Sequence, residues 1–133
     1  MKLAGIIFLV VALPYCSKIK ENNPSSLRLK ECGRYVYNGE TTRLCFDSVV
    51  SDSRCPANVV CVWEGTAVAK FSFHKNNEAY SLTLATRAVP TQFSKDTIVA
   101  GYKIEFINLL PYPGTVENPL PKNARAEVKV TRL

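Results

Sequence analysis

The residues of this chain best suited to chemistry are its five cysteines: Cys16, Cys32, Cys45, Cys55 and Cys61. Structural zinc sites use closely spaced cysteine pairs, but the last four cysteines are separated by 12, 9 and 5 residues. A thiol redox site would need Cys-x-x-Cys, which the chain lacks. The spacing therefore predicts no metal and no other cofactor, and it favours disulfide bonds.

The number of cysteines is odd, which is awkward for an exported protein. The start of the chain nevertheless indicates export. Met1 and Lys2 precede an apolar run of 11 residues at positions 3–13. This run is shorter than the roughly 20 apolar residues that cross a bilayer, and it fits a secretory signal.

The end of that run, Leu13-Pro14-Tyr15-Cys16, resembles the lipobox of bacterial lipoproteins, with tyrosine where a small residue is usual. The resemblance implies a lipoprotein signal peptide over residues 1–15 and a lipid on Cys16. We expect a flexible tether over 16–30 and one domain over 31–133. Four cysteines then remain for two disulfides in an oxidising compartment. An ordinary cleaved signal with an incidental cysteine is the alternative.

Residues 33–50 are expected to form a β-hairpin. Asn38-Gly39 is the favoured pair for a two-residue type I′ turn. In that register Cys32 faces Cys45 at a non-hydrogen-bonded position, where Cα atoms lie about 4.5 Å apart. That separation suits a disulfide. The hairpin therefore predicts a Cys32–Cys45 bridge.

The same register has one unfavourable consequence. It sets Arg34 opposite Arg43, and like charges that face each other across a strand pair are destabilising. This pairing weighs against the predicted register.

The rest of the chain alternates between apolar and polar residues, as in half-buried strands. Three strands are expected over residues 66–74, 79–85 and 124–133. A fourth, over 102–110, loses its alternation after Phe106, which indicates a bulge or burial on both faces. About seven short strands in roughly 100 residues predict an all-β fold, an antiparallel β-sandwich, immunoglobulin-like, with a small barrel as the alternative.

The most distinctive segment lies at residues 52–65. A Cys55–Cys61 disulfide would close a small loop there. We expect the neighbouring Asp52 and Arg54 to fix the loop through turn hydrogen bonds and an ion pair. Trp63 is expected in the core, packed on the disulfide. The alternative is that this is a binding loop, whose contacts come from Asp52, Arg54, Asn58, Trp63 and Glu64.

The letters D-S-R-C-P at residues 52–56, followed by Cys61, Trp63 and Gly65, resemble a family of small exported bacterial proteins, many of them lipoproteins. Ala is usual in that family where Glu64 stands here. The resemblance extends over most of the domain, through apolar strands before the motif and near the C-terminus. It implies an exported β-domain and no known activity.

Catalytic groups are scarce. His74 is the only histidine, and it falls on the polar face of an expected strand. Nucleophilic catalysis needs a base beside the nucleophile, and none is indicated. The 11 acidic residues form no suggestive pair for glycoside hydrolysis, and no phosphate-binding glycine loop occurs.

The formal charge of +6 falls to +5 when Lys2 leaves with the signal. The basic residues are scattered, so nucleic acid is not an expected partner. We expect a non-catalytic binding or accessory module of the bacterial cell envelope, attached by lipid to the outer membrane or to the periplasmic face of a membrane. Its partner would be an envelope protein or a glycan. The alternatives are a small protease inhibitor and an undetected hydrolase.

Overall fold

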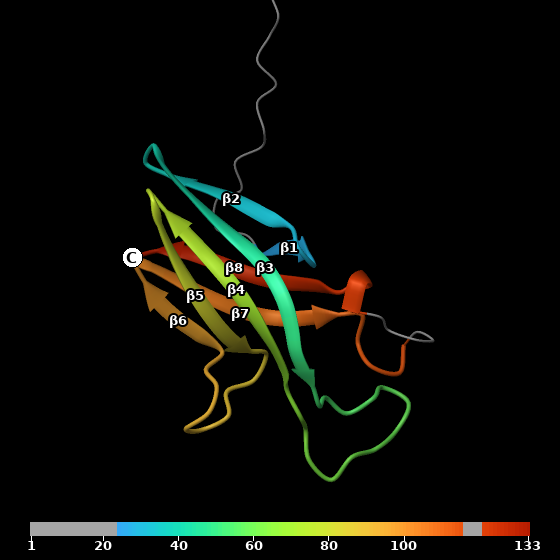
Figure 1. Cartoon of the computed structure of the whole chain (residues 1–133). Coiled ribbons are helices and arrows are strands. Elements are labelled where there is room, and N and C mark those ends of the chain that lie inside the picture. Colours follow the sequence, from blue (N-terminus) through green and yellow to red (C-terminus); the bar gives the residue numbers. More distant parts are fainter. Residues whose placement is uncertain (1–23, 116–120) are drawn as a thin grey trace, which may run out of the picture.

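Two four-stranded antiparallel sheets pack face to face in this computed structural model, which describes residues 24–115 and 121–133 (Figure 1). One sheet has the order β1-β8-β7-β6 and the other β2-β3-β4-β5. The strands are β1 (Ser25–Arg28), β2 (Cys32–Tyr37), β3 (Glu40–Asp52), β4 (Ala67–Lys75), β5 (Glu78–Ala85), β6 (Asp96–Val99), β7 (Tyr102–Leu110) and β8 (Arg125–Arg132). A single 3₁₀ turn, Pro121–Asn123, precedes β8. The predicted sandwich is confirmed.

The connections differ from those of an immunoglobulin domain. Within each sheet every hydrogen-bonded neighbour is consecutive in sequence, except that β1 pairs with β8. This is an up-and-down order, whereas immunoglobulin domains use Greek-key connections. The expected immunoglobulin-like topology is therefore wrong. The two links that pass between the sheets, β1–β2 and β5–β6, each join an edge strand of one sheet to an edge strand of the other.

The domain begins earlier than expected. Residues 25–28 were expected in the tether, but they form β1 along β8, with Leu27 3% exposed in the core. Four residues are too few to show clear alternation, which is why the pattern missed this strand and also β6. The predicted signal peptide, Cys16 and the first part of the predicted tether lie outside the described residues.

The predicted hairpin of β2 and β3 is confirmed in turn and register. Asn38 and Gly39 have φ angles of 48° and 79°, as a type I′ turn requires. Cys32 faces Cys45, and a disulfide joins them with 3.9 Å between their Cα atoms. The register also keeps the unfavourable pairing of Arg34 with Arg43.

Aromatic rings fill the space between the sheets. The ring of Phe71 lies 5.5 Å from that of Phe46 in its own sheet and 5.2 Å from that of Phe106 in the other. Phe73 and Tyr102 make a second contact across the sheets at 5.5 Å. Offset and edge contacts at these distances are the favoured geometry for aromatic pairs. The predicted bulge in β7 is present beside this cluster, between Phe106 and Asn108.

A polar cluster closes the end of the sandwich that carries the β2–β3 turn. The Tyr102 hydroxyl donates to Glu40 at 2.6 Å, and Lys75 Nζ lies 3.1 Å from the other carboxylate oxygen. The hydrogen bond from Tyr102, followed by that from Lys75, lowers the pKa of Glu40. Burial, followed by the same bond to Glu40, raises the pKa of Tyr102 to about 12. Glu40 therefore already has two donors.

Removing the Cys32–Cys45 bridge should destabilise the domain. A Cys32→Ala/Cys45→Ala variant frees a loop with a sequence separation of 13, and chain entropy then predicts a loss of roughly 3 kcal/mol. Urea denaturation followed by circular dichroism measures it. An unchanged midpoint would show that the bridge contributes nothing to the folded state under those conditions.

Candidate functional site

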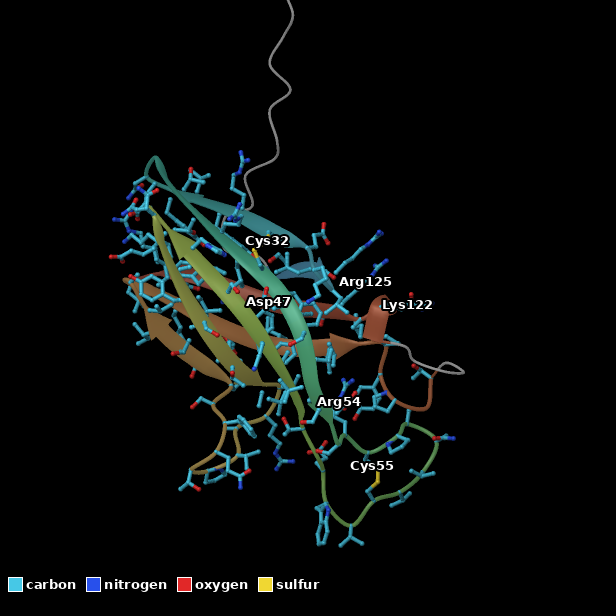
Figure 2. All side chains as sticks on the ribbon, in the orientation of Figure 1. Cys32, Asp47, Arg54, Cys55, Lys122 and Arg125 are labelled. Atoms are coloured by element: carbon cyan, nitrogen blue, oxygen red, sulfur yellow. A yellow bond between two sulfur atoms is a disulfide. The ribbon has the colours of Figure 1, made fainter. Side chains whose placement is uncertain are left out.

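The base of the β3–β4 loop is built around Arg54, whose side chain is only 5% exposed. Its Nε and Nη2 donate to the two carboxylate oxygens of Asp52, each at 2.8 Å, which is a bidentate ion pair. Its Nη1 donates to the carbonyl oxygen of Leu109 at 2.6 Å, at the end of β7. Its guanidinium carbon lies 4.6 Å from the ring centroid of Tyr112. Arg54 thus joins the two sheets at this end of the sandwich (Figure 2).

The two sides of the loop meet again just before β4. The Ser53 and Thr66 backbones are joined by a 3.0 Å hydrogen bond, and the Ser53 hydroxyl bonds to both the amide and the carbonyl of Thr66. A Cβ atom at Gly65 would lie 1.7 Å from the carbonyl oxygen of Ser53. Only glycine fits there, which is a physical reason for the glycine of the W-x-G motif.

The loop beyond this base is held at two further points. The Cys55–Cys61 disulfide predicted from loop closure is present, with 5.9 Å between the Cα atoms. The Ala57 amide donates to the carbonyl of Pro113 at 2.8 Å, in the loop that follows β7. Asn58 lies exposed beside Gly114. The disulfide therefore ties two points of the loop together, and the Ala57 amide ties the loop to the segment that follows β7.

Beyond these attachments the loop presents apolar side chains to solvent. Val59 is 52% exposed, Val60 102%, Val62 95% and Trp63 81%. We call these four residues the apolar tip. Figure 1 shows the loop projecting past the end of both sheets. Large exposed apolar groups gathered in one segment commonly mark interaction surfaces.

The expectation that Trp63 packs in the core is wrong. The strands close at Ser53 and Thr66, so Trp63 lies outside the last rung of the sheet. The core is already filled by the phenylalanines of β3, β4 and β7. The Cys55–Cys61 bridge also joins two points of one loop and does not cross between sheets, so it provides no buried surface for a tryptophan.

Two hollows flank Trp63. One, of about 610 Å³, lies between the disulfide loop and Tyr112. The other, of about 450 Å³, is lined by the β5–β6 connection, including Val89 and Phe93. Glu64 and Arg87 line both hollows and are joined by a 2.6 Å ion pair that is largely exposed. The apolar tip is thus bordered by one polar ion pair and by a hollow on each side of Trp63.

The predicted site residues divide into two groups. Asp52 and Arg54 fix the base, as expected, and the depth of Arg54 rules out its role as a binding contact. Asn58, Trp63 and Glu64 are exposed on the loop.

Other members of the site were not predicted. Arg87 and Tyr112 come from distant parts of the chain, and spacing gives no sign of them. The valines did have a signal, because residues 59–63 form an apolar run that fits no strand register.

The site offers contacts and no recognised catalytic group. His74, the only histidine, is placed on β4 far along the strand from the loop. Across residues 24–115 and 121–133, no group of three or more His, Cys, Asp and Glu side chains is arranged to hold a metal ion. In the same residues no helix has the length and apolar character needed to span a membrane.

Replacing Arg54 should loosen the loop and destabilise the fold. In Arg54→Ala, Asp52 and the carbonyl of Leu109 lose their donors, and a loss of roughly 2–4 kcal/mol follows. Arg87→Ala removes an exposed ion pair and should change stability by less than about 1 kcal/mol. Urea denaturation of both variants tests this. Equal losses would contradict the anchoring role of Arg54.

No family model, no curated protein and no solved structure matches this chain. The resemblance to exported proteins that carry the D-S-R-C-P and W-x-G letters stays a prediction.

Proposed function

We propose that this chain is a non-catalytic binding module of the bacterial cell envelope, lipid-anchored through Cys16, and that it binds a protein partner through the apolar tip. The observation that carries the proposal is the near-complete exposure of Val60, Val62 and Trp63 on a braced loop. Leaving such side chains in water is unfavourable, and a partner that covers them recovers that free energy.

The bracing of the tip favours binding. A loop that is already fixed by the Cys55–Cys61 bridge and the Arg54 base loses little conformational freedom when it meets a partner. Tryptophan is enriched among residues that dominate binding energy. The Glu64–Arg87 pair beside it provides the polar rim that surrounds the apolar centre of a typical interface.

The chemistry of the tip favours a protein over a glycan. A sugar can stack on Trp63, but it also needs hydrogen-bonding side chains close to the ring. The polar side chains next to Trp63, those of Glu64 and Arg87, are already paired with each other, and the rest of the tip is valine, whose side chain neither donates nor accepts hydrogen bonds. An apolar groove on a protein matches them better.

The position of the N-terminal strand suits an anchored module. The last residue of β1, Arg28, pairs with Arg125, the first residue of β8. Arg125 also pairs with Leu110, the last residue of β7, which lies at the loop end. β1 therefore runs toward the loop end. The chain therefore enters the domain from the opposite direction. A lipid on Cys16 would hold that side toward the membrane and leave the tip facing away from it. The two disulfides fit export to an oxidising compartment.

A peptidase inhibitor is the second candidate. The tip is convex and covalently braced, a shape that fits the cleft of an enzyme with little loss of entropy. Peptidase assays against the purified protein distinguish the two readings. Inhibition that disappears in the Trp63→Ala variant would establish the second, and hydrolytic turnover by the protein itself would contradict both.

A photo-crosslinking amino acid at Val62 should capture a partner in envelopes of the expressing cells, because the tip is the proposed contact. The matched control places it at Thr83, which is exposed on the outer face of β5. Trp63→Ala should reduce capture at position 62 by at least tenfold with an unchanged melting temperature, because Trp63 makes no core contact. The same adducts from both positions would exclude a specific tip.

Cys16 should carry lipid. Cells fed a clickable palmitate analogue should label the parent protein, while the Cys16→Ala variant should remain unlabelled. The control is the Cys32→Ala/Cys45→Ala variant, which should label like the parent because these cysteines are joined to each other in the domain. Labelling that survives in Cys16→Ala would refute the anchor.

A further inference from the structure

Three basic side chains form one row across the outer face of the β2-β3-β4-β5 sheet. Arg34 on β2 faces Arg43 on β3, and Arg43 in turn faces His74 on β4. Neighbouring strands lie about 4.8 Å apart, so the row spans about 10 Å. The Arg34–Arg43 position is a non-hydrogen-bonded one, the closer of the two kinds of antiparallel pair. We call these three residues the basic row.

The Cys32–Cys45 bridge keeps the row in place. It occupies the next non-hydrogen-bonded position of the same strand pair, two residues from each arginine. A shift of register by one residue would separate Arg34 from Arg43, but it would also break the bridge. The fold therefore maintains a like-charge contact that a small shift would relieve.

No acidic side chain neutralises the row within the described residues. The nearby acids have other partners: Glu40 is bonded to Tyr102 and Lys75, Asp47 accepts from Ser72, and Glu78 accepts from Tyr80. Two lysines of the other sheet, by contrast, do have acidic partners. On its outer side Lys95 pairs with Glu105 at 3.3 Å, and Lys103 pairs with Asp96 at 2.9 Å.

The row borders a hollow of about 430 Å³, also lined by Asn76 and Asn77 of the β4–β5 turn. Two guanidiniums, an imidazole and two amides supply many N–H donors. The one carboxylate in the lining, that of Glu78, accepts from Tyr80. Guanidinium is the side-chain group best matched to phosphate oxygens, which it can bind in pairs. The chemistry of the hollow suits a phosphate-bearing anion.

The place of the row in the domain indicates where that phosphate comes from. Ser25, the first residue of β1, contacts the hydroxyl of Tyr35, the neighbour of Arg34. Tyr35 reaches Ser25 through the core, while Arg34 points to the outer face, so the chain enters the domain at the level of β2 on the inner side of the sheet that carries the row. Eight residues lie between Cys16 and Ser25, so nine Cα steps join them, a reach of at most about 32 Å. A lipid on Cys16 would therefore keep the row close to a membrane surface.

We propose that Arg34, Arg43 and His74 bind the phosphate of anionic phospholipid headgroups and orient the anchored domain on the membrane. The membrane contact rests on the proposed anchor. The phosphate chemistry rests on the row alone. A single lipid chain gives weak attachment, and a basic surface is a common second contribution.

The single histidine makes the test direct. The full chain, labelled with ¹³C-histidine and carrying no histidine tag, is placed in bicelles of phosphatidylcholine with increasing phosphatidylglycerol. We expect the His74 ring signal to shift with the phosphatidylglycerol fraction. In Arg34→Gln/Arg43→Gln the fraction that gives half the shift should rise at least tenfold. The melting temperature should not fall, because the facing charges are gone.

The matched control is Arg28→Gln/Arg125→Gln, which removes another facing pair of arginines, from the opposite sheet. It changes the net charge equally, and its half-shift fraction should move by less than threefold. An equal effect of the two variants would reduce the site to general charge attraction. A His74 signal that ignores phosphatidylglycerol would overturn the proposal.

Two further experiments distinguish headgroup phosphate from free phosphate, and the proposed site from the proposed anchor. Glycerol phosphate in solution, added to phosphatidylcholine bicelles at the same phosphate concentration, should leave the His74 signal in place. An equal shift would make free phosphate the ligand and overturn the headgroup assignment. The Cys16→Ser protein at saturating phosphatidylglycerol should still shift. If the His74 signal of the Cys16→Ser protein does not shift while that of the parent does, the row does not bind headgroups unaided and the proposed site is overturned. If the parent protein instead proves not to be acylated, only the proposed anchor is overturned.

Discussion

The guanidinium of Arg54 connects more of this molecule than any other side chain at the loop end. It lies where β3 ends and reaches the end of β7 in the other sheet. Leu109 lies near the end of β7 and Pro111 just beyond it, and the carbonyls of both accept hydrogen bonds from Arg54. A buried arginine can supply them only because Asp52 balances its charge. One ion pair therefore closes the sandwich and fixes the starting direction of the loop.

The two ends of the domain have opposite chemistry as a result. The β3–β4 loop has its charges in two ion pairs, Asp52–Arg54 and Glu64–Arg87, and exposes valines and a tryptophan. The turn end has its acids engaged by tyrosines, Lys75 and Arg132, which leaves Arg34 and Arg43 without counterions among the described residues. Such a division suits a module that meets two different surfaces, one apolar and one anionic. The Cys32–Cys45 disulfide fixes the strand pair that carries Arg34 and Arg43, and the Cys55–Cys61 disulfide fixes the loop that carries the apolar tip.

Sequence reasoning succeeded where local rules are strong. The Asn38-Gly39 turn fixes the pairing of β2 with β3, and that pairing determines the first disulfide. It failed where tertiary contacts decide. β1 is only four residues long and is held by β8, about 100 positions away. The exposure of Trp63 follows from the closure of the sheet at Gly65, a backbone contact that composition does not reveal.

The site was predicted in part for the same reason. The role of Asp52 and Arg54 follows from two residues close in sequence, so a turn motif indicates it. Arg87 approaches Glu64 through a register set by β4 and β5, and Tyr112 reaches Arg54 through the end of β7. Because these partners are far apart in the sequence, the periodicity of the sequence cannot predict their contacts.

The first disulfide also has a mechanical consequence. A pulling force on the N-terminal side of the domain enters through β1, a four-residue edge strand that can peel from β8. Peeling stops at Cys32, because its bridge to Cys45 passes the load into the middle of β3. Seven residues, 25–31, are released before that stop, about 23–25 Å of extended chain. The first strand can thus yield under tension while the rest of the sandwich keeps its shape.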